Sequence, residues 1–289
     1  MLSRRTLLVS SAGLLAGVAR AAPPSLPSLS SLRIMRVRHR TTLVELGSAA
    51  GDEYRGPRRA LLDPCFSPGL GAGMVFRAGE VPLLPEEVGE IDLLLVSAHE
   101  PGAFSGDSTR RLRGRSASCL VADERTACTL RHQGYRRVRV VVAGDVFRTR
   151  DVVVHVSPSR AVLGGPAVGF HLERGARTLW HAGAPPPLDV ADGAIAFART
   201  QRAEVMTACP WGLSLAGRPL TLDREDALIL AGLCQARYAL LLDDDAAPTA
   251  LAAFVLTARP GSRRVPPGSR VKVAILEPGR WYRVRPAAP

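Results

Sequence analysis

Short apolar segments separated by turn residues follow one another along most of the chain. Residues 33–46 alternate apolar and polar positions, a period of two that predicts an edge β-hairpin. Residues 91–96 place five large apolar side chains around one early acid, which predicts a deeply buried strand. The apolar segment 60–64 predicts a short strand that ends at Asp-Pro. The strand is expected to stop there because proline cannot continue a ladder of backbone hydrogen bonds.

Strands and helices are then expected to alternate. Segments with helical spacing predict helices at residues 108–113, 124–133, 188–202, 224–236 and 249–256. Further strands are expected at residues 118–122, 138–142, 152–156, 168–172, 177–182, 204–208 and 238–242, with a terminal β pair formed by residues 271–276 and 281–284. No internal repeat or linker interrupts residues 32–289. The pattern therefore predicts one α/β sandwich domain over that range.

The N-terminal residues have the features of an export signal. Arg4 and Arg5 precede a short apolar segment and a small-residue cleavage site, so residues 1–22 resemble a twin-arginine signal peptide and residues 23–31 a linker. No later segment is apolar for long enough to span a bilayer. We expect export through the twin-arginine machinery to the periplasm or the exterior, with no transmembrane helix in the mature protein.

The formal net charge of +12 comes almost entirely from arginine, since Lys272 is the only lysine. Aromatic residues are 5% of the chain and offer few stacking partners for bases, so a nucleic-acid partner is not expected. The run Arg36, Arg38 and Arg40 is interpreted as part of a solvated basic surface. A second group could instead bind a phosphate or an acidic head group bidentately. Its members are Arg110, Arg111, Arg113 and Arg115.

Five cysteines are spread along the chain without the spacing of a zinc ribbon or a C-x-x-C motif. The odd number leaves at least one thiol unpaired, and unpaired cysteines are commonly buried as small apolar residues. Cys119 and Cys128 are the candidate disulfide pair, because they fall in a predicted strand and in the helix after it.

Five segments, in order, resemble the metallo-β-lactamase fold, in the branch of L-ascorbate-6-phosphate lactonase-like proteins and N-acyl-phosphatidylethanolamine phospholipase D. Arg38-His-Arg-Thr-Thr-Leu-Val-Glu45 stands where that branch has G-H-A-S/T-x-L-I/V-E. The other four are Leu61-Leu-Asp-Pro64 with Phe66-Ser67, residues 85–97, Thr178-Leu-Trp-His-Ala-Gly183 and residues 227–242. The resemblance implies a four-layer αββα sandwich and, ancestrally, a hydrolase with two zinc ions.

The zinc ligands that the resemblance implies are missing. Aligning Ser97 with the start of the family's S/T-H-x-H-x-D-H loop places Ala98, Glu100, Gly102 and Ala103 on the ligand positions. Shifting the alignment by one residue makes His99 the first ligand but leaves apolar residues at the others. The later ligand positions fall on residues 159–161, on Ala184 and on the run Asp243, Asp244 and Asp245. We therefore expect no bound zinc and no zinc-dependent hydrolysis.

The histidines and the aspartate that remain have ordinary structural interpretations. His39 and Asp63 stand at family positions that support the metal loop. His181 is expected to be a hydrogen-bonded residue behind the site, and His155 and His171 are expected to be satisfied histidines on strands.

Three functions remain open at this point. The leading hypothesis is a degenerate exported member of the family that binds a small ligand or an envelope partner. The second is an active hydrolase with a rearranged site drawn from His99, Glu100, His181, Asp243, Asp244 and Asp245. The third is a basic cell-envelope protein that docks on an anionic surface through the arginines of residues 110–115.

Overall fold

The structure is a computed structural model of the chain. It describes residues 31–47, 56–67, 82–149, 151–162, 164–183, 185, 187, 191–210, 214–215, 218–219, 222–242, 252–255 and 270–284. The segments for the signal peptide and most of the linker, residues 1–30, lie outside the described residues, as do Ala184 and Asp243, Asp244 and Asp245.

The N-terminal half and the late strand β17 form the first sheet, in which the described residues place strands in the order β17-β1-β2-β3-β4-β5-β6. The strands are β1 (Leu32–Arg38), β2 (Thr41–Leu46), β3 (Arg58–Leu62), β4 (Leu93–Val96), β5 (Ser118–Val121), β6 (Arg137–Val140) and β17 (Trp281–Val284). Pairing is antiparallel from β17 to β3 and parallel from β3 to β6. The ends of β3 and β4 therefore lie side by side, and the loops after them can build a site together.

The second sheet has the strand order β15-β16-β14-β11-β10-β9-β8-β7 within the described residues. Its strands are β7 (Val146–Arg148), β8 (Val153–Pro158), β9 (Val168–Arg174), β10 (Arg177–His181), β11 (Val205–Ala208), β14 (Tyr238–Leu241), β15 (Ala252–Val255) and β16 (Arg270–Ile275). A separate two-stranded pair joins β12 (Ser214–Leu215) to β13 (Arg218–Pro219). Strands β10, β11, β14 and β16 run parallel.

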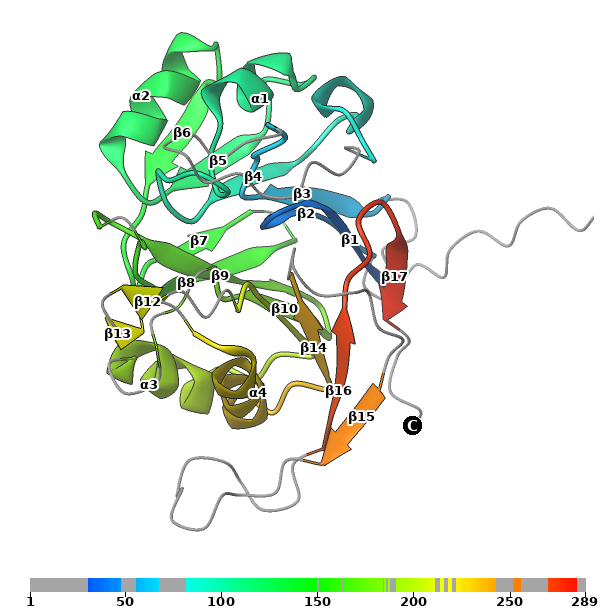
Figure 1. Cartoon of the computed structure of the whole chain (residues 1–289). Helices are drawn as coiled ribbons and strands as arrows, with labels where there is room; N and C mark the ends of the chain where they lie inside the picture. Colours follow the sequence, from blue (N-terminus) through cyan, green and yellow to red (C-terminus); the bar gives the residue numbers. More distant parts are fainter. Residues whose placement is uncertain are drawn as a thin grey trace, which may run out of the picture.

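Helices cover the outer face of each sheet, which gives four layers (Figure 1). They are η1 (Pro85–Glu87), α1 (Gly106–Arg111), α2 (Glu124–His132), α3 (Asp192–Thr200) and α4 (Arg224–Leu233). Ser105, Asp123 and Asp223 accept a hydrogen bond from the first turns of α1, α2 and α4, which fixes where those helices begin. None of the helices in the described part is long and apolar enough to cross a membrane.

Three apolar clusters hold the layers together. The central cluster joins the two sheets through alternating side chains such as Leu32 and Ile34 on β1 and Phe170 and Leu172 on β9. A second cluster packs α1 and α2 on the first sheet, and a third packs α3 and α4 on the second. The predicted four-layer αββα sandwich is confirmed.

Two predictions for the C-terminal part are wrong. Residues 252–255 form β15, which pairs with β16, where a helix over residues 249–256 was expected. The two strands of the expected terminal pair belong to different sheets, since β16 pairs with β14 and β17 with β1. Apolar patterning finds such strands but does not reveal their partners, because pairing is decided by tertiary packing.

The expected Cys119–Cys128 disulfide is also wrong. All five cysteines belong to the described residues and are free thiols. Cys119 lies in the core beneath α1 and α2, whereas Cys128 is exposed on α2 beside His132. A helix packed on a sheet turns one face toward the sheet and the other toward solvent, which separates these two sulfur atoms.

The missing side chain of Gly169 on β9 leaves room for a hydrogen bond between the strands on either side of it, β10 and β8. Trp180 on β10 donates from Nε1 to Ser157 Oγ on β8 at 3.0 Å, and Gly169 of the intervening strand pairs with Ser157. A Cβ atom at Gly169 would approach the carbonyl oxygen of His181 to 2.9 Å and collide with Ser157. Glycine is therefore required at this position, next to the strand end that carries His181.

Gly169→Ala is expected to lower the free energy of unfolding by about 1–3 kcal/mol, because the added methyl group has no free space and collides with Ser157 and the carbonyl oxygen of His181. Urea denaturation measures the loss. Gly56→Ala is the matched control, since a Cβ there meets no atom within 4 Å. Equal stability of the two variants would contradict the packing argument.

Candidate functional site

The site begins where β3 ends. Asp63 follows β3 with a positive φ of 49°, which turns its side chain into the loop after β4. Its carboxylate accepts hydrogen bonds from Ser97 N at 2.7 Å and from Ser97 Oγ at 2.8 Å. Thr41 Oγ1 donates to the carbonyl oxygen of Asp63 at 2.6 Å and so holds the turn against β2. Asp63 thus fixes the start of the loop at residues 97–105.

His181 and Asp63 join the two sheets through a fully buried hydrogen bond. His181 Nε2 lies 3.1 Å from Asp63 Oδ2, and its Nδ1 lies 2.9 Å from Thr207 Oγ1. Because an ionised carboxylate only accepts, Nε2 donates to Asp63 and the Thr207 hydroxyl can donate to Nδ1. Burial alone raises the pKa of Asp63, but the hydrogen bond from His181 and the charge of Arg40 hold that pKa below its usual value. Both ring nitrogens of His181 are therefore engaged.

Arg40 supplies a buried cation at this point. Its side chain is 1% exposed, and its Nη2 donates to Glu100 Oε1 at 2.7 Å. Its Nε lies 3.7 Å from Asp63 Oδ2. Burial by itself lowers the pKa of Arg40, but the negative charges of Asp63 and Glu100 raise it by more than burial lowers it. The net pKa is above its usual value, so the guanidinium stays protonated. We call Arg40, Asp63, Glu100 and His181 the arginine–carboxylate network.

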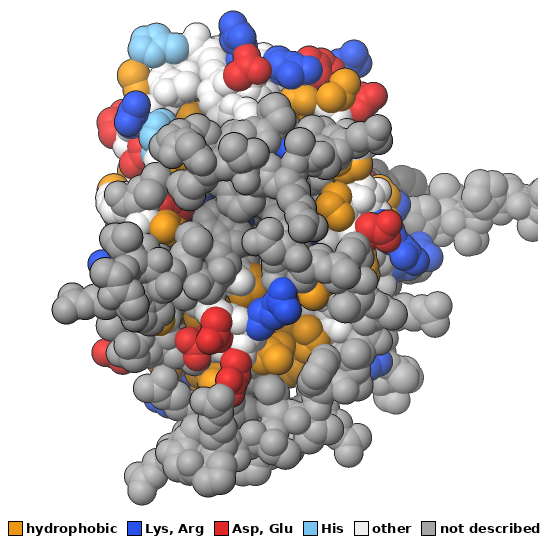
Figure 2. All heavy atoms as spheres, viewed as in Figure 1, with side chains coloured by type: hydrophobic (Ala, Val, Ile, Leu, Met, Phe, Trp, Pro, Cys, Tyr) orange, Lys and Arg blue, Asp and Glu red, His pale blue; other side chains and the backbone are white. Residues whose placement is uncertain are grey.

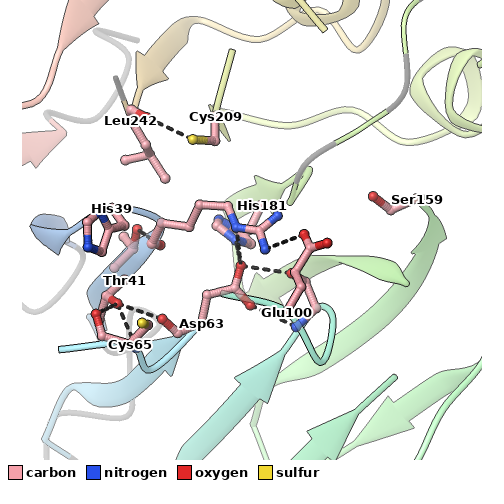
Figure 3. Close-up of polar contacts among 12 residues, drawn as sticks. His39, Thr41, Asp63, Cys65, Glu100, Ser159, His181, Cys209 and Leu242 are labelled. Atoms are coloured by element: carbon pink, nitrogen blue, oxygen red, sulfur yellow. Dashed lines mark hydrogen bonds and ion pairs between the residues drawn. The ribbon is translucent and has the colours of Figure 1, made fainter. Parts of the chain in front are cut away.

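Glu100 connects this network to the second sheet. Its Oε2 accepts a hydrogen bond from Val162 N at 2.8 Å, while its Oε1 is bound to Arg40. The backbone carbonyl of Glu100 accepts from Ala103 N and Phe104 N, which closes a tight turn over the loop. Gly102 has φ +85° in that turn, a conformation that favours glycine. Figure 3 shows the Asp63, Glu100 and His181 side chains directed toward one region between the sheets.

The residues at the family's metal positions do not fit a metal ion. Ala98, Gly102 and Ala103 have no donor atom, and Ala98 instead forms a backbone bridge to Ala167. Glu100 has a carboxylate, but both of its oxygens already bind protein groups. A guanidinium between two carboxylates also repels a second cation. No step of a reaction can therefore be assigned to zinc held by these residues.

The structure separates His99 from the network, although the rearranged-site hypothesis grouped them. His99 Nδ1 lies 2.8 Å from Thr126 Oγ1 on α2, and its ring packs on Phe104 at a centroid distance of 5.3 Å. Burial lowers the pKa of His99 and favours its neutral form. Glu100 and His181 are brought together, while Ala184 and the Asp243, Asp244 and Asp245 run lie outside the described residues.

A cavity of about 270 Å³ opens beside the network. Glu100 and His99 line it together with Phe104, Cys65, Ser67 and Ser105. Burial raises the pKa of the Cys65 thiol, so this wall offers no thiolate nucleophile. The lining combines aromatic and proline surface with hydroxyl groups, which suits a small ligand of mixed polarity.

His39 and the neighbouring arginines are more buried than expected. Burial, followed by the charge of Arg38, lowers the pKa of His39 to about 4, so the ring is neutral at pH 7. Arg36 donates to the carbonyl oxygens of His39 and Leu276, both at 3.2 Å. Arg36, Arg38 and Arg40 are each at most 6% exposed, so the predicted solvated basic surface is wrong for this run. Arg36 shares its face of β1 with Leu32 and Ile34, which explains why it enters the space between the sheets.

Arg40 is the site residue that the sequence interpretation missed. The signal was present, because Arg40 stands where the similar branch has an alanine in its G-H-A-S/T segment. A guanidinium in place of a methyl group, next to a loop whose Ala98, Gly102 and Ala103 side chains carry no donor atoms, marks this position. A solvated basic surface, the interpretation given to this run of arginines, does not describe Arg40, which is buried.

The arginines of residues 110–115 have partners within the protein. Arg110 pairs with Asp107, Arg111 binds Glu86 through two nitrogens, and Arg115 donates to Tyr135 Oη at 3.1 Å. Arg113 is exposed. In Figure 2 acidic and basic side chains lie next to one another at the end of the molecule that carries α1 and α2. This end is electrostatically mixed, not a uniform anion-binding patch.

Comparisons with known proteins find similarity in structure but not in sequence. No protein-family model matches the chain, and no curated protein matches it significantly. An isothiocyanate hydrolase from Delia radicum gut bacteria is similar over 72% of this chain and 84% of its own, with TM-score 0.57 and 14% identity. Igni18, a metallo hydrolase from Ignicoccus hospitalis, is similar over 88% of this chain and 99% of its own, with TM-score 0.57 and 14% identity.

The metallo-β-lactamase fold protein YhfI from Bacillus subtilis is similar over 73% of this chain and 85% of its own, with TM-score 0.51 and 12% identity. The three matches cover between 72% and 88% of this chain. At such low identity they establish architecture alone. The chain has the metallo-β-lactamase fold.

Proposed function

We propose that this protein is an exported metallo-β-lactamase-fold protein in which a buried arginine has replaced the metal centre, and that it binds a ligand or partner at the former catalytic position. The observation that carries the proposal is the Arg40 guanidinium held between Asp63 and Glu100. Two structural neighbours, an isothiocyanate hydrolase and a metallo hydrolase, carry the name of a hydrolase, which supports a hydrolase-like ancestry for this fold.

A guanidinium can replace the charge of a metal ion but not its chemistry. It neutralises Asp63 and Glu100, which would otherwise be an unstable buried pair of like charges. It cannot bind water as an inner ligand and lower the pKa of that water to near 7, as zinc does. It also has no vacant coordination position for a carbonyl or phosphoryl oxygen. The network therefore supports a role in stabilising the loop beside the cavity, and a binding function for that cavity.

Arg40→Met is expected to lower the free energy of unfolding by about 3–5 kcal/mol, because it leaves buried carboxylates without their cation. Adding Glu100→Gln to Arg40→Met should recover part of that loss, since it removes one of the uncompensated charges. Urea denaturation of the wild type, both single variants and the double variant measures the coupling.

Arg110→Met is the matched control, because the Arg110–Asp107 pair is exposed, and a change within about 0.5 kcal/mol is expected. If Arg40→Met yields too little folded protein, Glu100→Gln alone still tests the pair, since it removes the charge-assisted hydrogen bond to Arg40. The proposal fails if Arg40→Met and Glu100→Gln are both as mild as the control.

A hydrolysis panel tests the functional half of the proposal. Lactone, phosphodiester and β-lactam substrates, assayed with and without added Zn²⁺, are expected to show no turnover above the buffer rate. Calorimetric binding of any of these compounds without turnover, lost when Ser67→Trp fills the cavity, is the supporting result. Metal-dependent turnover that Glu100→Gln abolishes would establish the alternative of a rearranged hydrolase instead.

The localisation proposal rests on Arg4 and Arg5 ahead of a short apolar segment. Replacing both with lysine keeps the charge but removes the arginine pair that the export receptor reads, so the chain should remain in the cytoplasm. Cell fractionation with immunoblotting measures the distribution. Unchanged recovery of the lysine variant from the periplasm or the medium would exclude twin-arginine export.

A further inference from the structure

Three metal-binding side chains meet on the outer face of the second sheet. His155 on β8 is the direct cross-strand partner of His171 on β9, and Glu173 lies two residues farther along β9. Strand neighbours such as Val154 and Leu172 point into the core between the sheets. Because side chains alternate along a strand, the two histidines and the glutamate share the opposite face.

Their ligand atoms are closely spaced. Glu173 Oε1 lies 3.4 Å from His155 Nε2 and 3.4 Å from His171 Nδ1. The three side chains can each offer one ligand atom such that all three lie within 4.8 Å of one another. A tetrahedral ion with bonds of 2.0–2.1 Å needs ligand atoms about 3.3–3.4 Å apart, so two of the three edges already have that length.

The hydrogen bonding of His171 leaves a lone pair directed at this point. Its Nε2 lies 2.9 Å from the carbonyl oxygen of Arg202, and a carbonyl can only accept, so Nε2 carries the proton. Nδ1 is then the acceptor nitrogen. Among the described residues Nδ1 has no hydrogen-bond partner, although His171 is fully buried. Sequence analysis had predicted satisfied histidines, and for His171 this is wrong.

A histidine whose second nitrogen donates to a backbone carbonyl has the arrangement that metal-binding histidines use. The outer hydrogen bond fixes the tautomer and the orientation of the ring, so that the other nitrogen is held ready to bind an ion. Phe197 of α3 packs on the His171 ring at a centroid distance of 6.1 Å and further restricts its rotation. The first ligand is therefore positioned before any ion arrives.

Electrostatics also favour a cation here. The Nδ1 lone pair of His171 and the carboxylate oxygen of Glu173 are both acceptors, and they face each other at 3.4 Å. A divalent ion bound between the three side chains satisfies both acceptors.

We propose that His155, His171 and Glu173 form a binding site for one divalent cation of the zinc class, with water completing its coordination. Two imidazoles and one carboxylate are ligands that Zn²⁺ prefers over the all-oxygen sets of Ca²⁺ and Mg²⁺. His155 and Glu173 are partly exposed, with 21% and 34% of their side chains accessible, so an ion can enter from solvent and His155 can rotate to close the third edge.

This site is separate from the arginine–carboxylate network. The network lies between the sheets at the ends of β3 and β10, whereas the three ligands lie on the outer face of β8 and β9. The ion would join two neighbouring strands next to α3, and its binding does not depend on the proposed function of the cavity.

An isothermal titration calorimetry experiment, in which ZnCl₂ is added to the metal-free protein, tests the proposal. The wild type should bind one Zn²⁺ per chain at this site and show no comparable binding of Ca²⁺. His155→Gln and Glu173→Gln should each weaken binding by at least about tenfold, since even partners outside the coordination shell contribute about 10–100-fold. Both positions are partly exposed, so these variants are expected to fold. Substitution with Co²⁺ should give the visible absorption of a four-coordinate nitrogen and oxygen site.

His132→Asn is the matched control, because His132 is an exposed histidine beside Cys128 on α2 and could hold zinc adventitiously. It should leave the measured affinity unchanged. The proposal is overturned if the wild type binds no zinc, if His155→Gln and Glu173→Gln bind like the wild type, or if zinc is lost only in His132→Asn.

Discussion

The buried cation of Arg40 is the interaction on which the site depends. Its side chain is 1% exposed, and its guanidinium lies between Asp63, which binds the start of the loop after β4, and Glu100, which lies within that loop and binds Val162 N. Removing a charge from water is expensive, so a buried arginine is retained only where its partners surround it closely. The hydrogen bond to Glu100 depends on that charge, which, after the hydrogen bond from His181, also holds the pKa of Asp63 below its usual value.

In the proposed function, an arginine in this position supplies the positive charge of a metal ion without its reactivity. A covalently attached cation cannot be lost to a chelator, and its protonation does not change in the physiological range. It also presents fixed hydrogen-bond donors in place of a vacant coordination position. The loop after β4 and the cavity beside it are therefore held in place although the side chains of Ala98, Gly102 and Ala103 carry no donor atoms.

The two faces of the second sheet carry side chains with different contacts. Its inner face carries the apolar side chains of the central core and ends at His181, whose nitrogens are both hydrogen-bonded. Its outer face carries His171, whose Nε2 is bound to a backbone carbonyl while Nδ1 is directed at Glu173. Two buried histidines on neighbouring strands thus differ in whether a lone pair remains for a ligand, and only their surroundings make that difference.

Period-two patterning and turn residues determined the strands, most helix positions and the four-layer class, because burial of alternate side chains is written directly into the sequence. The absence of donor atoms in the side chains of Ala98, Gly102 and Ala103 could also be read from the chain. Only the tertiary structure decided which strands pair, since residues 270–284 divide between two sheets. It alone placed Arg40 between carboxylates 23 and 60 residues away and set His155 opposite His171, because contacts between distant segments depend on how the sheets pack and not on local spacing.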